Sequence, residues 1–393
     1  MNNTFSPLTE EEKQCIEEFG NQNPKDLYFK ANQPQLSFKK VAAQIEKRQK
    51  LRKKLPTWTA NLDVFFPHQL ALEQCSSEAL ANYKASKIEK GTAFIDLTGG
   101  FGLDAWAFSS RFESSIYVEQ QSDLVELAKH NFNVLDANIQ VVEGNGIDVL
   151  TKTNSTFDLI YLDPARRKQD KKVFRLEDCE PNLIEHQDVL LSKTKLLMAK
   201  HSPLVDLDYL KSTLKHLIKI EVLALHNECK EILTFQSKST QVDFETEAIN
   251  LINNDLTQTY KKTTHPTCAI NSEPKTYIYI PNVALLKAQM SEQIAVDFKL
   301  SKFATSCHFY LSDDYHKTYP GRCFKVESVF DNLKDLKKKV KGKRREVICK
   351  HAVLTPEELK KKTALRFGSD EAFVLAGKNQ NQKMIYFDCI RQD

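Results

Sequence analysis

The sequence lacks the features that mark a membrane protein or a secreted protein. Among its 393 residues, no apolar run approaches the ~18 residues that cross a bilayer, and the N-terminus has no signal-peptide pattern. The nine cysteines are scattered, odd in number and never spaced as C-x-x-C, which argues against disulfides and a structural zinc site. We therefore expect a soluble, cytoplasmic protein without a metal centre, and the length suggests two or three domains.

Glycine is also scarce, with 11 residues in all, yet Gly99, Gly100 and Gly102 fall within four positions. They lie in the run Ala93-Phe-Ile-Asp-Leu-Thr-Gly-Gly-Phe-Gly-Leu-Asp104, which predicts a buried strand, a tight turn and a helix beginning near Leu103. Glycines supply positive φ and let backbone approach a ligand, and the N–H groups of the helix point back at the turn. The run therefore predicts a site for a nucleotide-type cofactor.

Two cofactors suit such a turn. Gly100-x-Gly102-x-x-Ala105 satisfies the dinucleotide fingerprint G-x-G-x-x-G/A, which is weak on its own. The nearby Asp96 and Asp104 would repel a pyrophosphate, but they would attract the ammonium and sulfonium groups of S-adenosylmethionine. The charges favour S-adenosylmethionine, and a nicotinamide oxidoreductase is the alternative.

Polar residues end the next two predicted strands. Glu119 closes the strand at 114–119, where it is placed to accept hydrogen bonds from ribose hydroxyls. Asn145 lies at the end of a strand at 139–146 and either contacts the adenine edge or serves as an ordinary turn residue. Both positions fit a cofactor bound across the ends of neighbouring strands.

A fourth strand, beginning at Phe157, ends in Asp163-Pro164 and two arginines, Arg166 and Arg167. In an open α/β sheet, ligands bind outside the carboxyl ends of the strands, so Asp163 is expected to face the same crevice. Its carboxylate would accept a hydrogen bond from a substrate amine or hydroxyl, and the planar arginine groups suit phosphate. The alternative is a turn carrying a solvated basic pair.

The motifs Asp96-Leu-Thr-Gly-Gly-Phe-Gly102, Glu119 and Asp163-Pro-Ala-Arg166 resemble motif I, the acidic ribose position and motif IV of class I S-adenosylmethionine-dependent methyltransferases. Shorter segments resemble a bacterial branch with a C-terminal THUMP-like domain: 73–78, 200–203, 227–231, 277–282 and 319–322. The resemblance implies a Rossmann-like seven-stranded sheet, S-adenosylmethionine as cofactor and RNA recognition. Ala165 and Arg166 depart from the Asp/Asn-Pro-Pro-Tyr form of motif IV, so the aromatic residue that would stack on a flipped base is missing and the target atom stays open.

The predicted catalytic residues are Asp163 and Arg166. The predicted cofactor-binding residues lie in the glycine turn, at the neighbouring strand ends or just upstream of the first strand: Asp96, Thr98, Gly99, Gly100, Gly102, Asp104, Glu119, Asn145, Asp163, Gln74 and Ser76. The resemblance implies that Gln74 and Ser76 fold over the methionine end of the cofactor, with helix capping as the alternative. Cys179 and Cys229 are alternative nucleophiles for C5-pyrimidine methylation, although a structural thiol is the stronger interpretation of each. His201, at the end of the fifth predicted strand, is expected to be structural.

The net charge of +4 is unevenly distributed. The segment 322–393 carries +8, much of it in residues 334–345, and a second basic stretch occupies residues 47–54. Two such stretches could converge on one polyanion such as RNA, where each phosphate contact adds affinity that salt erodes. A charge run can equally be a solvated face, but the THUMP-like resemblance favours RNA.

The expected architecture is α/β. We predict an N-terminal helical region (1–88), a methyltransferase domain (89–240), a ferredoxin-like α+β unit (273–318) and a THUMP-like basic unit (319–393), with strand fragments at best in 236–272. The predicted function is methyl transfer from S-adenosylmethionine, directly to an RNA base. A small-molecule methyltransferase and a non-catalytic RNA-binding protein with a relic cofactor site are the alternatives, and the oligomeric state stays open.

Overall fold

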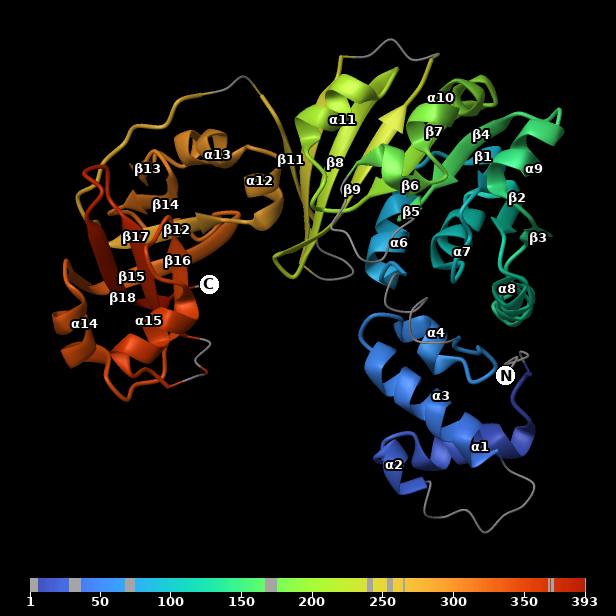
Figure 1. Ribbon diagram of the computed structural model, residues 1–393, viewed down its shortest axis with the longest axis horizontal. Coiled ribbons are helices and arrows are strands. Elements are labelled where there is room, and N and C mark those ends of the chain that lie inside the picture. The colour runs from blue at the N-terminus through green and yellow to red at the C-terminus, as the bar shows by residue number, and fades with distance from the viewer. Residues whose placement is uncertain are drawn as a thin grey trace. The chain divides into compact units, whose positions relative to one another are not determined.

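The computed structural model describes residues 6–27, 37–67, 75–166, 175–238, 243–252, 257–263, 266–366, 368 and 371–392 (Figure 1). The chain forms two compact units. The first comprises residues 1–220 and 232–244, and the second comprises residues 221–231 and 245–393. Within the described ranges, no helix has the length and apolar character to cross a membrane.

The first unit begins with four helices: α1 (Glu10–Phe19), α2 (Pro24–Leu27), α3 (Phe38–Leu51) and α4 (Pro56–Ala60). Thr9 and Glu12 form a capping box at the start of α1, because each side chain accepts the other's backbone N–H. The apolar sides of α1 and α3 pack together around Ile16 and Ile45. Helix α4 begins at Pro56, because proline is well suited to the first turn of a helix.

Arg48 of α3 holds the segment that follows α4. It is buried, and its guanidinium donates to the carbonyl oxygens of Thr59, Asn61, Leu62 and Val64 at 2.6–3.0 Å. Burial lowers the pKa of Arg48 to about 10. Part of the basic stretch 47–54 is therefore internal.

The remaining elements of the first unit alternate between strand and helix. They are α6 (Glu78–Ser86), β1 (Gly91–Asp96), α7 (Leu103–Ser109), β2 (Phe112–Glu119), α8 (Ser122–Val134), β3 (Gln140–Glu143), α9 (Gly146–Lys152), β4 (Phe157–Leu162), the short pair β5 (Ala165–Arg166) and β6 (Cys179–Glu180), the 3₁₀ turn η1 (Leu176–Asp178), α10 (Leu183–Ser192), β7 (Thr194–His201) and α11 (Leu207–Thr213). The hairpin β8 (Leu217–Leu225) and β9 (Glu228–Gln236) contributes to both units.

The large sheet has the order β11-β10-β8-β9-β7-β4-β1-β2-β3. Strands β3, β2, β1, β4 and β7 are parallel, and β9 runs antiparallel to β7. The central strands are continuous apolar runs, such as Leu159-Ile160 of β4, because helices cover a parallel sheet on both faces. The predicted α/β class and the Rossmann-like sheet are confirmed.

In the second unit, β10 (Glu245–Leu251) and β11 (Thr257–Lys261) form an antiparallel hairpin. The prediction of strand fragments at best in 236–272 is wrong here. The outer strand β11 is polar and alternates between exposed and half-buried residues, as an edge strand can. Such a strand has no apolar run that would reveal it.

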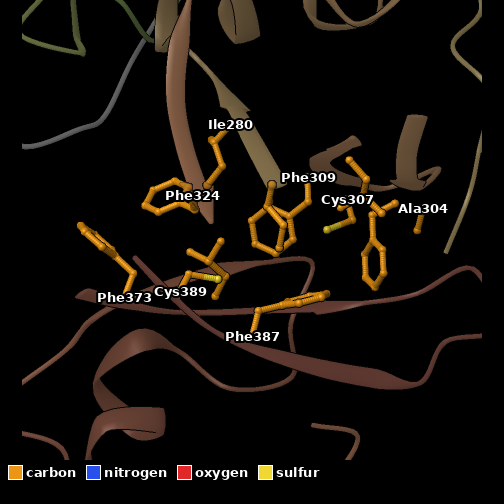
Figure 2. Close-up of a cluster of buried hydrophobic side chains, with 12 residues drawn as sticks. Ile280, Ala304, Cys307, Phe309, Phe324, Phe373, Phe387 and Cys389 are labelled. Atoms are coloured by element: carbon orange, nitrogen blue, oxygen red, sulfur yellow. The ribbon is translucent and has the colours of Figure 1, made fainter. Parts of the chain in front are cut away.

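A seven-stranded sheet in the order β13-β14-β12-β15-β18-β17-β16 makes up the rest of the second unit. The strands of this sheet and the helices between them are β12 (Tyr277–Pro281), α12 (Val283–Lys287), α13 (Ser291–Asp297), β13 (Ser301–Ala304), β14 (Cys307–Ser312), β15 (Gly321–Phe330), α14 (Leu333–Val340), β16 (Glu346–Lys350), α15 (Pro356–Thr363), β17 (Ala372–Lys378) and β18 (Met384–Arg391). Figure 2 shows one core that Phe309 shares with Phe324, Phe373 and Phe387. Segments on both sides of residue 319 thus contribute to the same sheet and the same core.

We expect the substitution Arg48→Met to lower the free energy of unfolding of the first unit by about 3 kcal/mol, because it leaves four carbonyl oxygens without their charged donor. Both tryptophans lie in this unit, with ring centroids 5.8 Å apart, so fluorescence during urea unfolding reports on it. Lys53→Met, at an exposed position nearby, is the control and should change little. Equal stability of the two variants would contradict the role given to Arg48.

Candidate functional site

The glycine turn after β1 needs its glycines for two different reasons. A Cβ at Gly99 would overlap the ring of Tyr117, and one at Gly102 would overlap the ring of Phe132. At Gly100 the nearest atom to such a Cβ is the oxygen of Thr98 at 3.7 Å, so a side chain would project into the clear side of the turn. Gly100 and Gly102 also have φ of +60° and +87°, which L-residues rarely adopt. Packing therefore explains two of the glycines, and Gly100 keeps one side of the backbone open to a ligand.

Glu119, at the end of β2, supports this turn. One carboxylate oxygen accepts the backbone N–H of Gly100 at 2.8 Å, and the other accepts that of Gln121 at 2.8 Å. The hydroxyl of Tyr117, on the same strand, donates to the carbonyl oxygen of Gly100 at 2.6 Å. A carboxylate oxygen can accept more than one hydrogen bond, so the residue can still receive ribose hydroxyls.

Asp96 and Thr98 tie the end of β1 to the end of β4. The buried carboxylate of Asp96 accepts both the backbone N–H and the hydroxyl of Thr98, at 2.9 and 3.2 Å. The hydroxyl oxygen of Thr98 in turn accepts the backbone N–H of Asp163 at 2.6 Å. Burial raises the pKa of Asp96 to about 7, although the hydrogen bonds from Thr98 oppose that shift. Asp96 thus stabilises the turn through its hydrogen bonds from Thr98.

Asp104, in the first turn of α7, belongs to a buried polar network. Its carboxylate lies 2.9 Å from the ammonium of Lys84 and accepts hydroxyl hydrogens from Tyr161 at 2.8 Å and Ser76 at 3.0 Å. Lys84, fully buried on α6, also donates to Ser76 at 2.8 Å. Burial by itself would raise the pKa of Asp104, but Lys84 and Lys200 hold it well below its usual value. The structure brings Ser76 and Asp104 together beneath the glycine turn.

Asp163 follows β4 and is the most open carboxylate of the site, with 38% of its side chain exposed. The ammonium of Lys200, near the end of β7, lies 2.5 Å from its Oδ2. Arg166 lies in the two-stranded ribbon of β5 and β6, opposite Cys179, and its side chain is outside the described part of the structure. Gln74 also lies outside the described residues.

Asn145 caps the N-terminus of α9. Its side-chain oxygen accepts the backbone N–H groups of Ile147 and Asp148, at 2.9 and 3.2 Å. This arrangement matches the turn interpretation of the residue.

The histidine and the thiols considered from the sequence have structural surroundings. His201 is buried, its Nε2 lies 2.8 Å from the hydroxyl of Thr234, and burial lowers its pKa to about 4. These surroundings are those expected of a structural histidine. Burial raises the pKa of Cys229 to about 11, the opposite of what activates a thiol nucleophile. Cys179 lies 3.6 Å from the carbonyl oxygen of Arg175.

Sequence reasoning missed Lys84, Lys200, Tyr117 and Tyr161 as members of this site. Tyr161 and Lys200 do carry a signal in hindsight, because each is a polar side chain in or directly after an apolar strand run. Lys84 carries none, since a lysine on an amphipathic helix is ordinarily exposed. Only the packing of α6 against α7 turns it toward Asp104.

Comparison with known proteins shows what the chain is similar to. Residues 76–211 match a family described as conserved hypothetical protein 95, residues 277–320 match a ferredoxin-like domain, and residues 321–387 match a THUMP domain-like family. The chain is also similar to a candidate methyltransferase from Porphyromonas gingivalis W83. The identity is 29% and the TM-score 0.85, over 99% of this chain and 100% of the other. The resemblance inferred from the sequence is thereby confirmed: the chain is similar over nearly its whole length to a candidate methyltransferase, and its C-terminal part matches ferredoxin-like and THUMP-like domains.

Other solved structures are similar to parts of the chain. A candidate class I S-adenosylmethionine-dependent methyltransferase from Listeria monocytogenes is 13% identical, over 63% of this chain and 95% of that one, with a TM-score of 0.39. A candidate methyltransferase from Streptococcus mutans, solved with S-adenosylhomocysteine, is 11% identical over 43% and 98%, with a TM-score of 0.31. No curated protein matches the chain.

The raised pKa of Asp96 predicts a specific pH dependence of stability. A carboxyl group whose pKa is higher in the folded state stabilises the fold below its unfolded pKa, and this contribution is lost as pH rises toward about 7. We therefore expect the stability of Asp96→Asn, relative to that of the native protein, to increase as the pH rises from 4 to 7.5. The total increase is about 4 kcal/mol at most. Thermal unfolding of both proteins across this range measures the difference. Parallel pH curves would contradict the role of burial at Asp96.

Proposed function

We propose that this protein is an S-adenosylmethionine-dependent methyltransferase that acts on RNA. The observation that carries the proposal is the joint position of three features at the carboxyl ends of the parallel neighbours β1, β2 and β4. The glycine turn follows β1, Glu119 ends β2 and Asp163 follows β4. Ligands of open α/β sheets bind at such ends, so cofactor-binding and acceptor-binding groups face one crevice.

The turn suits S-adenosylmethionine better than a dinucleotide. A dinucleotide site needs backbone N–H groups to approach the pyrophosphate, but here Gly100 already donates its N–H to Glu119. A carboxylate in that position instead suits ribose hydroxyls. In this proposal Glu119 binds the ribose, Asn145 borders the adenine, and Gln74 and Ser76 lie near the methionine end. Asp96, Thr98, Gly99, Gly102 and Asp104 shape the turn around Gly100.

The protein's part in the reaction is to position and polarise. When bound, S-adenosylmethionine supplies an activated methyl group on a sulfonium. Asp163 accepts a hydrogen bond from the acceptor group and orients it toward that methyl, and holding reactants in line accounts for much of the rate of such a transfer. Arg166, two residues beyond Pro164, binds a phosphate of the substrate.

RNA as substrate is supported by the surface of α14 and α15 within the THUMP-like match. The apolar sides of these helices are buried around Leu336, Val340 and Leu359, which leaves their cations outside. The exposed cations of the two helices and the adjoining loops are Lys334, Lys337, Lys338, Lys339, Lys341, Lys343, Arg344, Lys361, Lys362 and Arg366. Arg345 does not count among them, because it pairs with the buried Asp388 at 2.7 Å.

The N-terminal basic stretch supports RNA binding less well. Arg48 is internal, and Lys47 is half-buried and donates to the carbonyl oxygen of Phe66 at 3.0 Å. Lys50, Arg52 and Lys53 are its exposed members. We further propose that residues 1–88, 89–240, 273–318 and 319–393 act as helical, methyltransferase, ferredoxin-like and THUMP-like domains of one enzyme.

Asp163→Ala should abolish methyl transfer while leaving the affinity for S-adenosylhomocysteine within a few-fold of the native value. The reason is that Asp163 faces the acceptor, whereas the cofactor contacts come from the turn and Glu119. Calorimetry with S-adenosylhomocysteine and transfer of radiolabelled methyl groups to RNA from cells lacking the protein measure the two effects. Glu119→Ala is the complementary control, because it should lower the affinity for S-adenosylhomocysteine. Surviving turnover in Asp163→Ala would remove Asp163 from the mechanism.

Replacing Lys337, Lys338 and Lys341 by glutamine should weaken RNA binding and flatten its salt dependence. For single-stranded RNA, the slope of log K against log salt is negative, and its magnitude decreases by about 0.7 for each phosphate that a lysine no longer neutralises. The matched variant replaces Lys50, Arg52 and Lys53 by glutamine and should bind RNA nearly as the native protein does. If the N-terminal variant binds RNA more weakly than the C-terminal variant, the RNA interface lies on the N-terminal basic stretch instead. Native RNA binding in both variants, with methyl transfer to a small molecule, would favour the small-molecule alternative.

A further inference from the structure

Asp163 and Lys200 are brought together by the register of two strands. β4 and β7 are parallel neighbours, and Leu162 pairs with Ala199. Asp163 directly follows Leu162 at the end of β4, and Lys200 directly follows Ala199 within β7, so the two residues lie side by side. Their contact is the 2.5 Å approach of the Lys200 ammonium to Oδ2 of Asp163.

Lys200 has a second carboxylate neighbour, Asp104, but the two neighbours differ. Oδ2 of Asp104 is 3.9 Å from the ammonium, and Asp104 is already paired with Lys84 at 2.9 Å. Tyr161 and Ser76 donate further hydrogen bonds to it. Lys84 is thus the nearer ammonium of Asp104, whereas Lys200 lies closer to Asp163 than to Asp104.

Because Lys200 is largely buried, its ammonium needs to stay near a carboxylate. The side chain of Lys200 is 10% exposed, and a buried ammonium is costly unless it is paired and hydrogen-bonded. It therefore cannot move away from the carboxylate at low cost. Asp163 is held at a second point too, since its backbone N–H donates to the hydroxyl oxygen of Thr98 at 2.6 Å. One anchor comes from the cofactor turn and the other from β7.

We propose that Lys200 is a positioning residue for methyl transfer. It fixes the Asp163 carboxylate through Oδ2 and so turns Oδ1 toward the acceptor group. This inference rests on the proposed function, in which Asp163 orients the acceptor. A carboxylate that is 38% exposed would otherwise sample several rotamers in water, and few of them would align the acceptor with the methyl group.

The test compares three single variants of the full chain. Lys200→Met removes the ammonium and keeps most of the side-chain volume, and Lys200→Arg keeps the charge. Lys195→Met is the matched control, because Lys195 lies on the same strand and pairs with an aspartate, Asp158, at 2.7 Å but is 78% exposed. For each variant, kcat and KM for methyl transfer to RNA from cells lacking the protein are measured, together with the Kd of S-adenosylhomocysteine.

We expect Lys200→Met to lower kcat by about 100-fold, as misplacing a reacting group by about 1 Å can, with the Kd of S-adenosylhomocysteine changed less than about three-fold. Lys200→Arg should recover at least about ten-fold of that decrease, and Lys195→Met should match the native protein. A native kcat in Lys200→Met would overturn the proposal. A fall in cofactor affinity in step with kcat would overturn it too, because Lys200 would then support the cofactor turn.

Crystal structures of the native protein and Lys200→Met separate this inference from the proposed function. If the native protein transfers no methyl group to RNA, the function on RNA fails, and the structures still decide the role of Lys200. The inference expects Asp163 to change rotamer or lose order in Lys200→Met while the glycine turn stays in place. An unchanged Asp163 side chain would overturn it.

Discussion

The hydroxyl of Thr98 is the group on which the geometry of the site depends. It donates to the buried Asp96 and accepts the backbone N–H of Asp163, so one small side chain joins the end of β1 to the end of β4. The glycine turn begins at the next residue. The paired strands β1 and β4 already hold these ends together, and the Thr98 hydrogen bonds extend that connection to the first residues beyond the strands.

The acidic residues around the turn have different roles because their surroundings differ. Asp96 is buried with two hydrogen bonds from Thr98 and a raised pKa, whereas Asp104 is buried against Lys84 and has a lowered pKa. Glu119 receives backbone N–H groups and Asp163 receives an ammonium. A sequence shows four carboxylates near one turn, but only their neighbours decide which is neutralised and which still faces a ligand.

Much of the fold could be predicted, and the failures have physical reasons. Buried parallel strands are apolar runs bounded by turn residues, so β1, β4 and β7 were visible in the sequence. The polar edge strand β11 has no such run. In the site, the turn and Asp163 were predictable from their motifs. The partners were not, because Lys84 lies 20 residues from Asp104 and Lys200 lies 37 residues from Asp163 in the chain.

The sequence by itself determined the class of protein, since the glycine turn, Glu119 and Asp163 are local patterns that need no knowledge of distant contacts. Only the tertiary structure decided what each charge does. The internal position of Arg48, the ion pair of Asp104 with Lys84 and the hold of Lys200 on Asp163 all join residues from separate elements. The energy of a charge depends on burial and on its neighbours in space, and neither can be read from order along the chain.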